Sequence, residues 1–116
     1  MQAKNLPSLN PRQLEDISTL FKVLGEPMRL RILQAVCRKP RNVNEIVTAT
    51  GGTQANISKH LALLTMAGIL SRRKEGQRVF YGINNRLAVN LCELVRSQLS
   101  TTSTVPSRNR RTSAKA

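Results

Sequence analysis

VNEIVTATGGTQANISKHLALLTMAGIL, residues 43–70, is the stretch of sequence that decides the fold of this chain. A short segment with apolar residues at helical spacing comes first and is interrupted by Gly51-Gly52, where glycine can adopt a positive φ without strain. A longer amphipathic segment follows and ends at Ala67, with one apolar face made of Ile57, Leu61 and Leu64. Two helices joined by a tight glycine turn predict a helix-turn-helix, whose second helix can enter a DNA major groove.

Capping residues stand where both of these helices are expected to begin. Asn42 can cap the first helix, and Glu45 three residues later completes a capping box. Thr53 can cap the second helix, because its hydroxyl oxygen can accept a hydrogen bond from a backbone N–H of the first turn. The sequence therefore predicts helix starts just after Asn42 and at Thr53.

The periodicity changes after the second helix. Two β-prone runs, residues 70–74 and 78–83, flank Glu75-Gly76-Gln77 and predict a β-hairpin. Basic residues lie on both arms near the tip of this hairpin: Arg72, Arg73, Lys74 and Arg78. A helix-turn-helix followed by a hairpin is a winged helix.

Further helices are predicted on both sides of this unit. One should run from Pro11 to Gly25, and a second should begin near Pro27 and stop before Pro40. A last helix is expected from about Asn85 to Leu99, with an unusually wide apolar face. Such a face favours a dimer made through this helix, together with the first, although packing within one protomer is an alternative. The expected fold class is mainly α with a small β-hairpin, a winged helix-turn-helix with a helical dimer interface.

Three regions are predicted along the chain: a flexible lead-in over residues 1–10, a winged-helix DNA-binding and dimerisation domain over 11–99, and a disordered basic tail over 100–116. The net charge of +13 indicates a polyanionic partner, and nucleic acid is favoured over membrane. Aromatic residues make up only 3% of the chain, which argues against a single-strand binder that stacks bases. The sequence shows no membrane-spanning run and no signal peptide, and its two cysteines are expected to be reduced thiols in a cytoplasmic protein.

The start of the second helix of the helix-turn-helix is rich in polar side chains. Gln54, Asn56, Ser58 and Lys59 lie away from the apolar stripe of that helix. Asn and Gln can pair bidentately with adenine, and Ser can contact a phosphate or a base. The basic hairpin next to this helix is expected to contact the DNA backbone, so double-stranded DNA is the predicted partner.

Three segments together resemble the ArsR/SmtB family of bacterial winged-helix repressors: LFKVLGEPMRLRIL (20–33), TQANISKHLALLTMAGIL (53–70) and SRRKEGQRVFYGI (71–83). The resemblance covers about residues 14–99. It implies a homodimer that binds an inverted-repeat operator and is released by a ligand, commonly a metal or metalloid ion. It also implies phosphate or minor-groove contacts from the wing, and DNA contacts from Thr53, Gln54, Asn56, Ser58, Lys59 and His60.

The metal sites common in that family are not predicted here. Residues 42–48 lack the Cys-x-Cys pair that arsenite and cadmium sensors often carry, and His60 is the only histidine of the chain. Neither a metal site nor a cofactor is therefore expected. Cys37 and Cys92 are interpreted either as small buried apolar residues or as a dithiol switch that responds to oxidant, persulfide or arsenite.

Two other classes of function compete with a DNA-binding repressor. An enzyme is not expected, because no nucleophile–base set, phosphate loop or carboxylate pair stands out. A winged-helix module that binds protein or RNA, without an effector site, remains the alternative. Gel shifts with inverted-repeat DNA and with structured RNA separate these possibilities.

Overall fold

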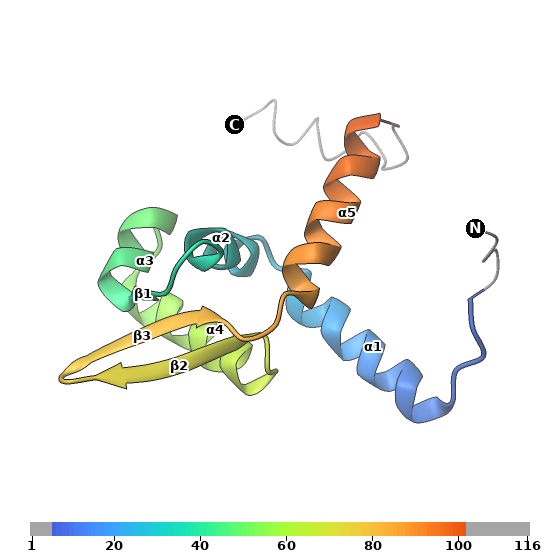
Figure 1. Ribbon diagram of the computed structural model, residues 1–116, viewed down its shortest axis with the longest axis horizontal. Helices are drawn as coiled ribbons and strands as arrows, with labels where there is room; N and C mark the ends of the chain where they lie inside the picture. Colours follow the sequence, from blue (N-terminus) through green and yellow to red (C-terminus); the bar gives the residue numbers. More distant parts are fainter. Residues whose placement is uncertain (1–5, 102–116) are drawn as a thin grey trace. The chain divides into compact units, whose positions relative to one another are not determined.

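The computed structural model describes residues 6–101 as five helices and three strands (Figure 1). In chain order these are α1 (Pro11–Leu24), α2 (Pro27–Val36), β1 (Arg41–Asn42), α3 (Val43–Thr50), α4 (Gln54–Met66), β2 (Leu70–Glu75), β3 (Arg78–Ile83) and α5 (Leu87–Thr101). The chain forms two compact units, one ending at Asn85 and one beginning at Arg86. The predicted class, mainly helical with a winged helix-turn-helix, is confirmed.

Helices α2, α3 and α4 bury the apolar core of the first unit. Ile32, Ile46, Ile57, Leu61 and Leu64 are completely buried, so the predicted stripe of α4 is confirmed. At about 25 cal/mol per Å² of apolar surface, burying each of these side chains contributes roughly 1.5–3 kcal/mol. Because three of the five belong to α4, this helix is held firmly along its inner face while its outer face is left to solvent.

The predicted helix ends of the helix-turn-helix are also confirmed. The Asn42 side chain accepts from the backbone N–H of Glu45 at 2.9 Å, and the Glu45 carboxylate accepts from the backbone N–H of Asn42 at 3.0 Å. Gly51 closes α3 with φ +78°. A residue with a side chain would be strained in this left-handed conformation, so glycine permits the sharp turn into α4.

The sheet has three antiparallel strands in the order β1-β3-β2, which corrects the predicted two-stranded hairpin. β1 contains only two residues, with Arg41 opposite Tyr81 and Asn42 opposite Phe80. A strand this short has no alternating pattern that sequence analysis can detect. The two long strands β2 and β3 form an extended hairpin whose tip projects beyond the helices α3 and α4 (Figure 1).

Helix α1 begins where its capping residues predict. Asn10 and Gln13 form a capping box, Pro11 occupies the first turn, and Gly25 follows the last residue. Leu14, Ile17 and Phe21, at helical spacing on this helix, are 51%, 40% and 57% exposed. α1 therefore carries an apolar face that its own unit leaves open to solvent.

Helix α5, taken by itself, is amphipathic. It begins at Leu87 rather than at Asn85, and it continues two residues beyond the predicted end at Leu99. The side-chain amide of Asn84, which precedes this helix, donates to the carbonyl of Gly68 at 2.9 Å. Large apolar side chains on α5 are 44–59% exposed: Leu87, Leu94, Val95 and Leu99.

The polar side of α5 carries an ion pair between Glu93 and Arg96. The hydrogen bond and the charge of Arg96 lower the pKa of the Glu93 carboxyl, and the same pairing raises the pKa of Arg96. Within residues 6–101, none of the helices is both long and apolar enough to cross a membrane. The predictions for residues 1–5 and for most of the basic tail, 102–116, lie outside the described residues.

Candidate nucleic-acid interface

The outer face of α4 presents the polar residues predicted to read DNA. Gln54, Asn56, Ser58 and Lys59 are all exposed, while Ile57 between them is completely buried. This separation follows from the helical period, because residues three or four apart share a face and immediate neighbours do not. The polar groups lie on the first two turns of the helix, where its unpaired N–H groups also favour a negatively charged partner.

Thr53 has a structural task at the start of α4. Its hydroxyl oxygen accepts a hydrogen bond from the backbone N–H of Asn56 at 3.2 Å. The residue is exposed, and its hydroxyl proton is still free to be donated to an oxygen acceptor such as a phosphate. Capping and DNA contact are therefore compatible roles for this side chain.

His60 differs from the other predicted contact residues, because it lies against the body of the protein. Its side chain is only 14% exposed. Its Nδ1 accepts a hydrogen bond from Arg29 Nε at 3.2 Å, and its Nε2 lies 4.0 Å from the carboxylate of Glu26. The structure thus places His60 beside the start of α2 instead of grouping it with the exposed residues of α4.

One face of the hairpin carries two cations from β2. Arg72 lies opposite Tyr81 in the β-ladder and Lys74 lies opposite Val79, so all four side chains share this face. Both cations are exposed. Each cation therefore has an aromatic or apolar cross-strand neighbour, Tyr81 or Val79.

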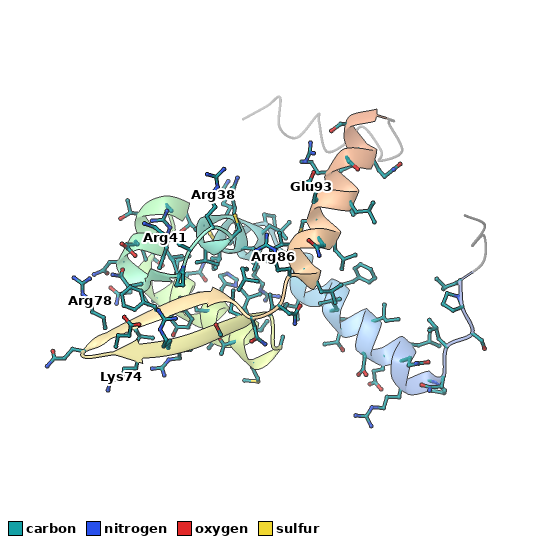
Figure 2. All side chains as sticks on the ribbon, viewed as in Figure 1. Arg38, Arg41, Lys74, Arg78, Arg86 and Glu93 are labelled. Carbon is teal, nitrogen blue, oxygen red and sulfur yellow. The ribbon has the colours of Figure 1, made fainter. Side chains whose placement is uncertain are left out.

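The other face of the hairpin contains an ion pair. Arg73 Nε donates to Glu75 Oε2 at 2.8 Å, with both side chains more than half exposed at 57% and 56%. Arg78 lies opposite Glu75, so this face holds two cations and one carboxylate. Lys74 and Arg78 leave the hairpin on opposite sides (Figure 2). The four predicted wing residues therefore divide into two pairs with different electrostatic surroundings.

Three charged residues near this interface have contacts that the sequence pattern did not predict. Arg29 is half-buried and connects α2 to α4, Arg41 donates from Nε to the carbonyl of Ala35 at 2.8 Å, and Glu75 neutralises Arg73. In the sequence Arg29 and Arg41 look like ordinary surface cations and Glu75 like a turn residue. Only the spatial neighbours of these side chains distinguish them.

The two cysteines belong to different units of the chain. Cys37 follows α2 and donates from Sγ to the carbonyl of Gln34 at 3.3 Å, and Cys92 lies on α5. Both are cysteine thiols and both are half-buried. Burial raises the pKa of the Cys92 thiol above its usual value, because a thiolate is poorly solvated there. Within the described part of the chain, no group of three or more His, Cys, Asp or Glu residues is arranged to hold a metal ion.

Comparison with known proteins places these features in a family. Residues 26–72 match the profile described as bacterial regulatory protein, arsR family. A probable mercury resistance operon repressor from Streptomyces lividans is 33% identical over 76 residues, which are 66% of this chain and 61% of that protein. The chain thus spans less than two thirds of that relative's length.

Two further similarities cover more of the other protein. The transcriptional repressor PagR of Bacillus anthracis is 31% identical over 83 residues, which are 71% of this chain and 83% of PagR. The homodimeric winged helix-turn-helix DNA-binding domain Mb0332 from Mycobacterium bovis, a possible ArsR-family transcriptional regulator, is 28% identical with a TM-score of 0.69. That match covers 82% of this chain and 91% of the Mycobacterium bovis domain.

Proposed function

Because the chain belongs to the ArsR family of bacterial regulatory proteins, a family of regulators and not of enzymes, we propose that it is a homodimeric transcriptional repressor that binds an inverted-repeat operator. The observation that carries this proposal is the division of α4 into two faces. Its inner face is completely buried at Ile57, Leu61 and Leu64, and the polar side chains of its first two turns are exposed. A rigidly seated helix with a free polar N-terminal half is suited to reading base edges in a major groove.

Affinity and choice of site come from different parts of this interface. Arg72 and Lys74 on one face of the wing supply phosphate contacts, which release counterions and make binding sensitive to salt. Gln54 and Asn56 on α4 supply hydrogen bonds to base edges, which select the sequence. Arg73 and Arg78, which share their face with Glu75, contribute less to phosphate binding in this scheme.

The dimer is assembled through α5 and the outer face of α1. Each helix exposes large apolar side chains that water solvates poorly. In a two-fold symmetric dimer the apolar patch of one protomer packs against the same patch of its partner. The recognition helix α4 of each protomer then contacts one half-site of an inverted repeat. The symmetry of the operator therefore follows from the symmetry of the protein.

The proposal is tested with duplexes selected by the protein from a random library. An inverted repeat should be enriched, and it should bind at least about a thousandfold more tightly than a shuffled duplex at physiological salt. A structured RNA of equal length serves as competitor. Preferential binding of the RNA, with no enriched DNA repeat, supports the alternative of an RNA-binding module.

Replacing Gln54 or Asn56 with Ala is expected to reduce discrimination at individual base pairs. Each lost pair of hydrogen bonds should narrow the gap between correct and wrong bases by about 1–3 kcal/mol. The matched control is Lys74→Ala, which should weaken binding to the selected and shuffled duplexes equally and reduce the salt dependence by about one unit of slope. Equal losses on both duplexes for the α4 substitutions would remove these residues from base readout.

A thiol-directed signal at Cys37 and Cys92 is proposed as the release mechanism. A disulfide between them would tie the unit that contains α4 to the α5 unit, and could thereby couple oxidation to the dimer. Arsenite held by the two thiols is the metalloid form of the same mechanism.

The raised pKa of Cys92 leads to a prediction about its reactivity. In a Cys37→Ser variant at pH 7.5, iodoacetamide should modify Cys92 more slowly in the folded than in the urea-unfolded chain, because less thiolate is present. The folded rate should rise as pH increases toward the elevated pKa. For the switch itself, operator affinity is compared before and after persulfide, oxidant or arsenite treatment. A response that persists in both Cys37→Ser and Cys92→Ser would rule the thiols out.

A further inference from the structure

A single guanidinium joins three helices behind the recognition helix. Arg29, in the first turn of α2, donates from Nη1 to the carbonyl of Val23 near the end of α1 at 3.0 Å. It also donates from Nε to Nδ1 of His60 in the middle of α4 at 3.2 Å. Glu26 caps the same turn, since its carboxylate accepts from the backbone N–H of Arg29 at 3.1 Å. The arginine, the capping carboxylate and the imidazole therefore form one cluster.

The hydrogen bond between Arg29 and His60 fixes the chemical state of the imidazole. Arginine cannot accept a hydrogen bond and does not lose its proton, so Nδ1 of His60 must supply a lone pair. The histidine is then neutral, with its proton on Nε2. That proton points toward the side of Glu26, whose carboxylate is 4.0 Å from Nε2, too far for a strong hydrogen bond.

A directional hydrogen bond restrains the rotation of α4 about its axis, which the apolar stripe of this helix does not do. Ile57, Leu61 and Leu64 hold the helix against the core, but apolar packing is non-directional. A hydrogen bond to a planar guanidinium that is itself anchored on α1 restricts rotation of α4 about its own axis. Such rotation would move the exposed side chains of Gln54 and Asn56 away from their base edges.

We propose that Arg29 and His60 form a positioning clamp that sets the orientation of the recognition helix, and that His60 acts through Arg29 and not by contacting DNA. The proposal rests on the proposed DNA-binding function and assigns a new role to two residues of the same interface. Arg29 is the centre of the clamp because its guanidinium bonds to both α1 and α4. His60 supplies the acceptor on α4.

Protonation of His60 opens the clamp. Once both ring nitrogens carry protons, Nδ1 has no lone pair for Arg29, and two cations face each other. The imidazolium is attracted to Glu26 instead, while Lys59, its charged neighbour on α4, is exposed. On α1, Lys22 precedes the Val23 carbonyl that anchors Arg29, and it is likewise exposed.

The chain contains one histidine, which makes the pH dependence easy to assign. Protonation of His60 in mild acid should lower the affinity for the selected inverted repeat relative to a shuffled duplex. Non-specific binding should not weaken, because the added charge is positive and DNA is a polyanion. The ratio of the affinity for the selected repeat to the affinity for the shuffled duplex should therefore fall about tenfold.

The experiment measures this ratio for the full chain and three variants, each first checked for cooperative unfolding. His60→Asn keeps an acceptor near the position of Nδ1 but cannot be protonated, so its ratio should match wild type at pH 7.5 and stay constant down to pH 5.5. His60→Leu removes the acceptor, and Arg29→Lys keeps the charge but replaces the two separate donor nitrogens, Nε and Nη1, with one ammonium nitrogen on a shorter side chain. Both should lower the ratio about tenfold at pH 7.5.

Other outcomes would overturn the clamp. If His60→Leu binds both duplexes equally less well, and acid strengthens wild-type binding to both, His60 contacts phosphate directly. An unchanged ratio in both His60→Leu and Arg29→Lys also contradicts the proposal.

A measurement without DNA separates the clamp from the proposed function. Nitrogen-15 NMR of the imidazole at pH 7.5 should show the proton on Nε2, and Arg29→Lys should shift the Nδ1 resonance. A proton on Nδ1 would overturn the clamp whether or not the protein binds DNA. If the protein selects no duplex but the NMR signature is present, the proposed DNA-binding function is wrong. The hydrogen bond between Arg29 and His60 is then a structural contact only.

Discussion

Replacing Leu94 with glutamate is expected to convert the dimer to a monomer and to lower the affinity for the inverted repeat at least about a hundredfold. Leu94 is 59% exposed on the apolar side of α5, and a two-fold interface would bury it twice. A carboxylate forced into that interface would lose its hydration without a matching partner, which costs several kcal/mol. Each recognition helix would then have to bind its half-site alone.

Sedimentation velocity at micromolar concentration and gel shifts on the selected repeat measure the two effects. Ser100→Glu is the matched control, because it adds the same charge to an exposed polar position on another side of α5, away from Leu94. This control should remain dimeric. A Leu94→Glu protein that stays dimeric and binds normally would show that α5 is not the dimer interface.

Replacing Ile57 with alanine should lower the free energy of unfolding by about 2–5 kcal/mol. Ile57 is completely buried one turn into α4. Its side chain also fills the space beside the turn, since a Cβ added at Gly52 would lie only 2.9 Å from Ile57 Cδ1. Alanine would leave a cavity between the turn and α4, which close-packed neighbours cannot fully fill.

Urea and thermal unfolding monitored by circular dichroism measure this loss, without DNA. The melting temperature should fall by roughly 10 °C or more, given the size of the domain. Met66→Ala on the same helix is the control, because Met66 is 85% exposed and its truncation should change stability by less than about 0.5 kcal/mol. Equal losses in both variants would contradict the role of Ile57 in anchoring α4 to the core.

The helix-turn-helix could be predicted because its determinants are local. Capping by Asn42 and Thr53 and the positive φ of Gly51 each depend on residues within one or two turns. The spacing of the apolar stripe likewise reports on a single helix. Position on α4 was therefore enough to predict that Gln54 and Asn56 would be exposed.

β1 could not be predicted for the opposite reason. Its two residues form a strand only because β3, about forty positions later, offers Tyr81 and Phe80 as ladder partners. The start of α5 also differs from the prediction, because the helix begins at Leu87 and not at about Asn85. The partners of β1 lie far away in the chain, where local sequence patterns do not indicate them.

The sequence by itself determined the winged helix-turn-helix, the two faces of α4 and the basic character of the wing, because periodicity, capping and charge are properties of neighbouring residues. Only the tertiary structure decided which polar side chains become neighbours in space. It brought Arg29 from α2 against His60 on α4, and it paired Arg73 with Glu75 while Lys74 lies on the opposite face of the hairpin. Hydrogen bonds and ion pairs require atoms within about 3–4 Å, and the rotation of each helix and strand sets those distances.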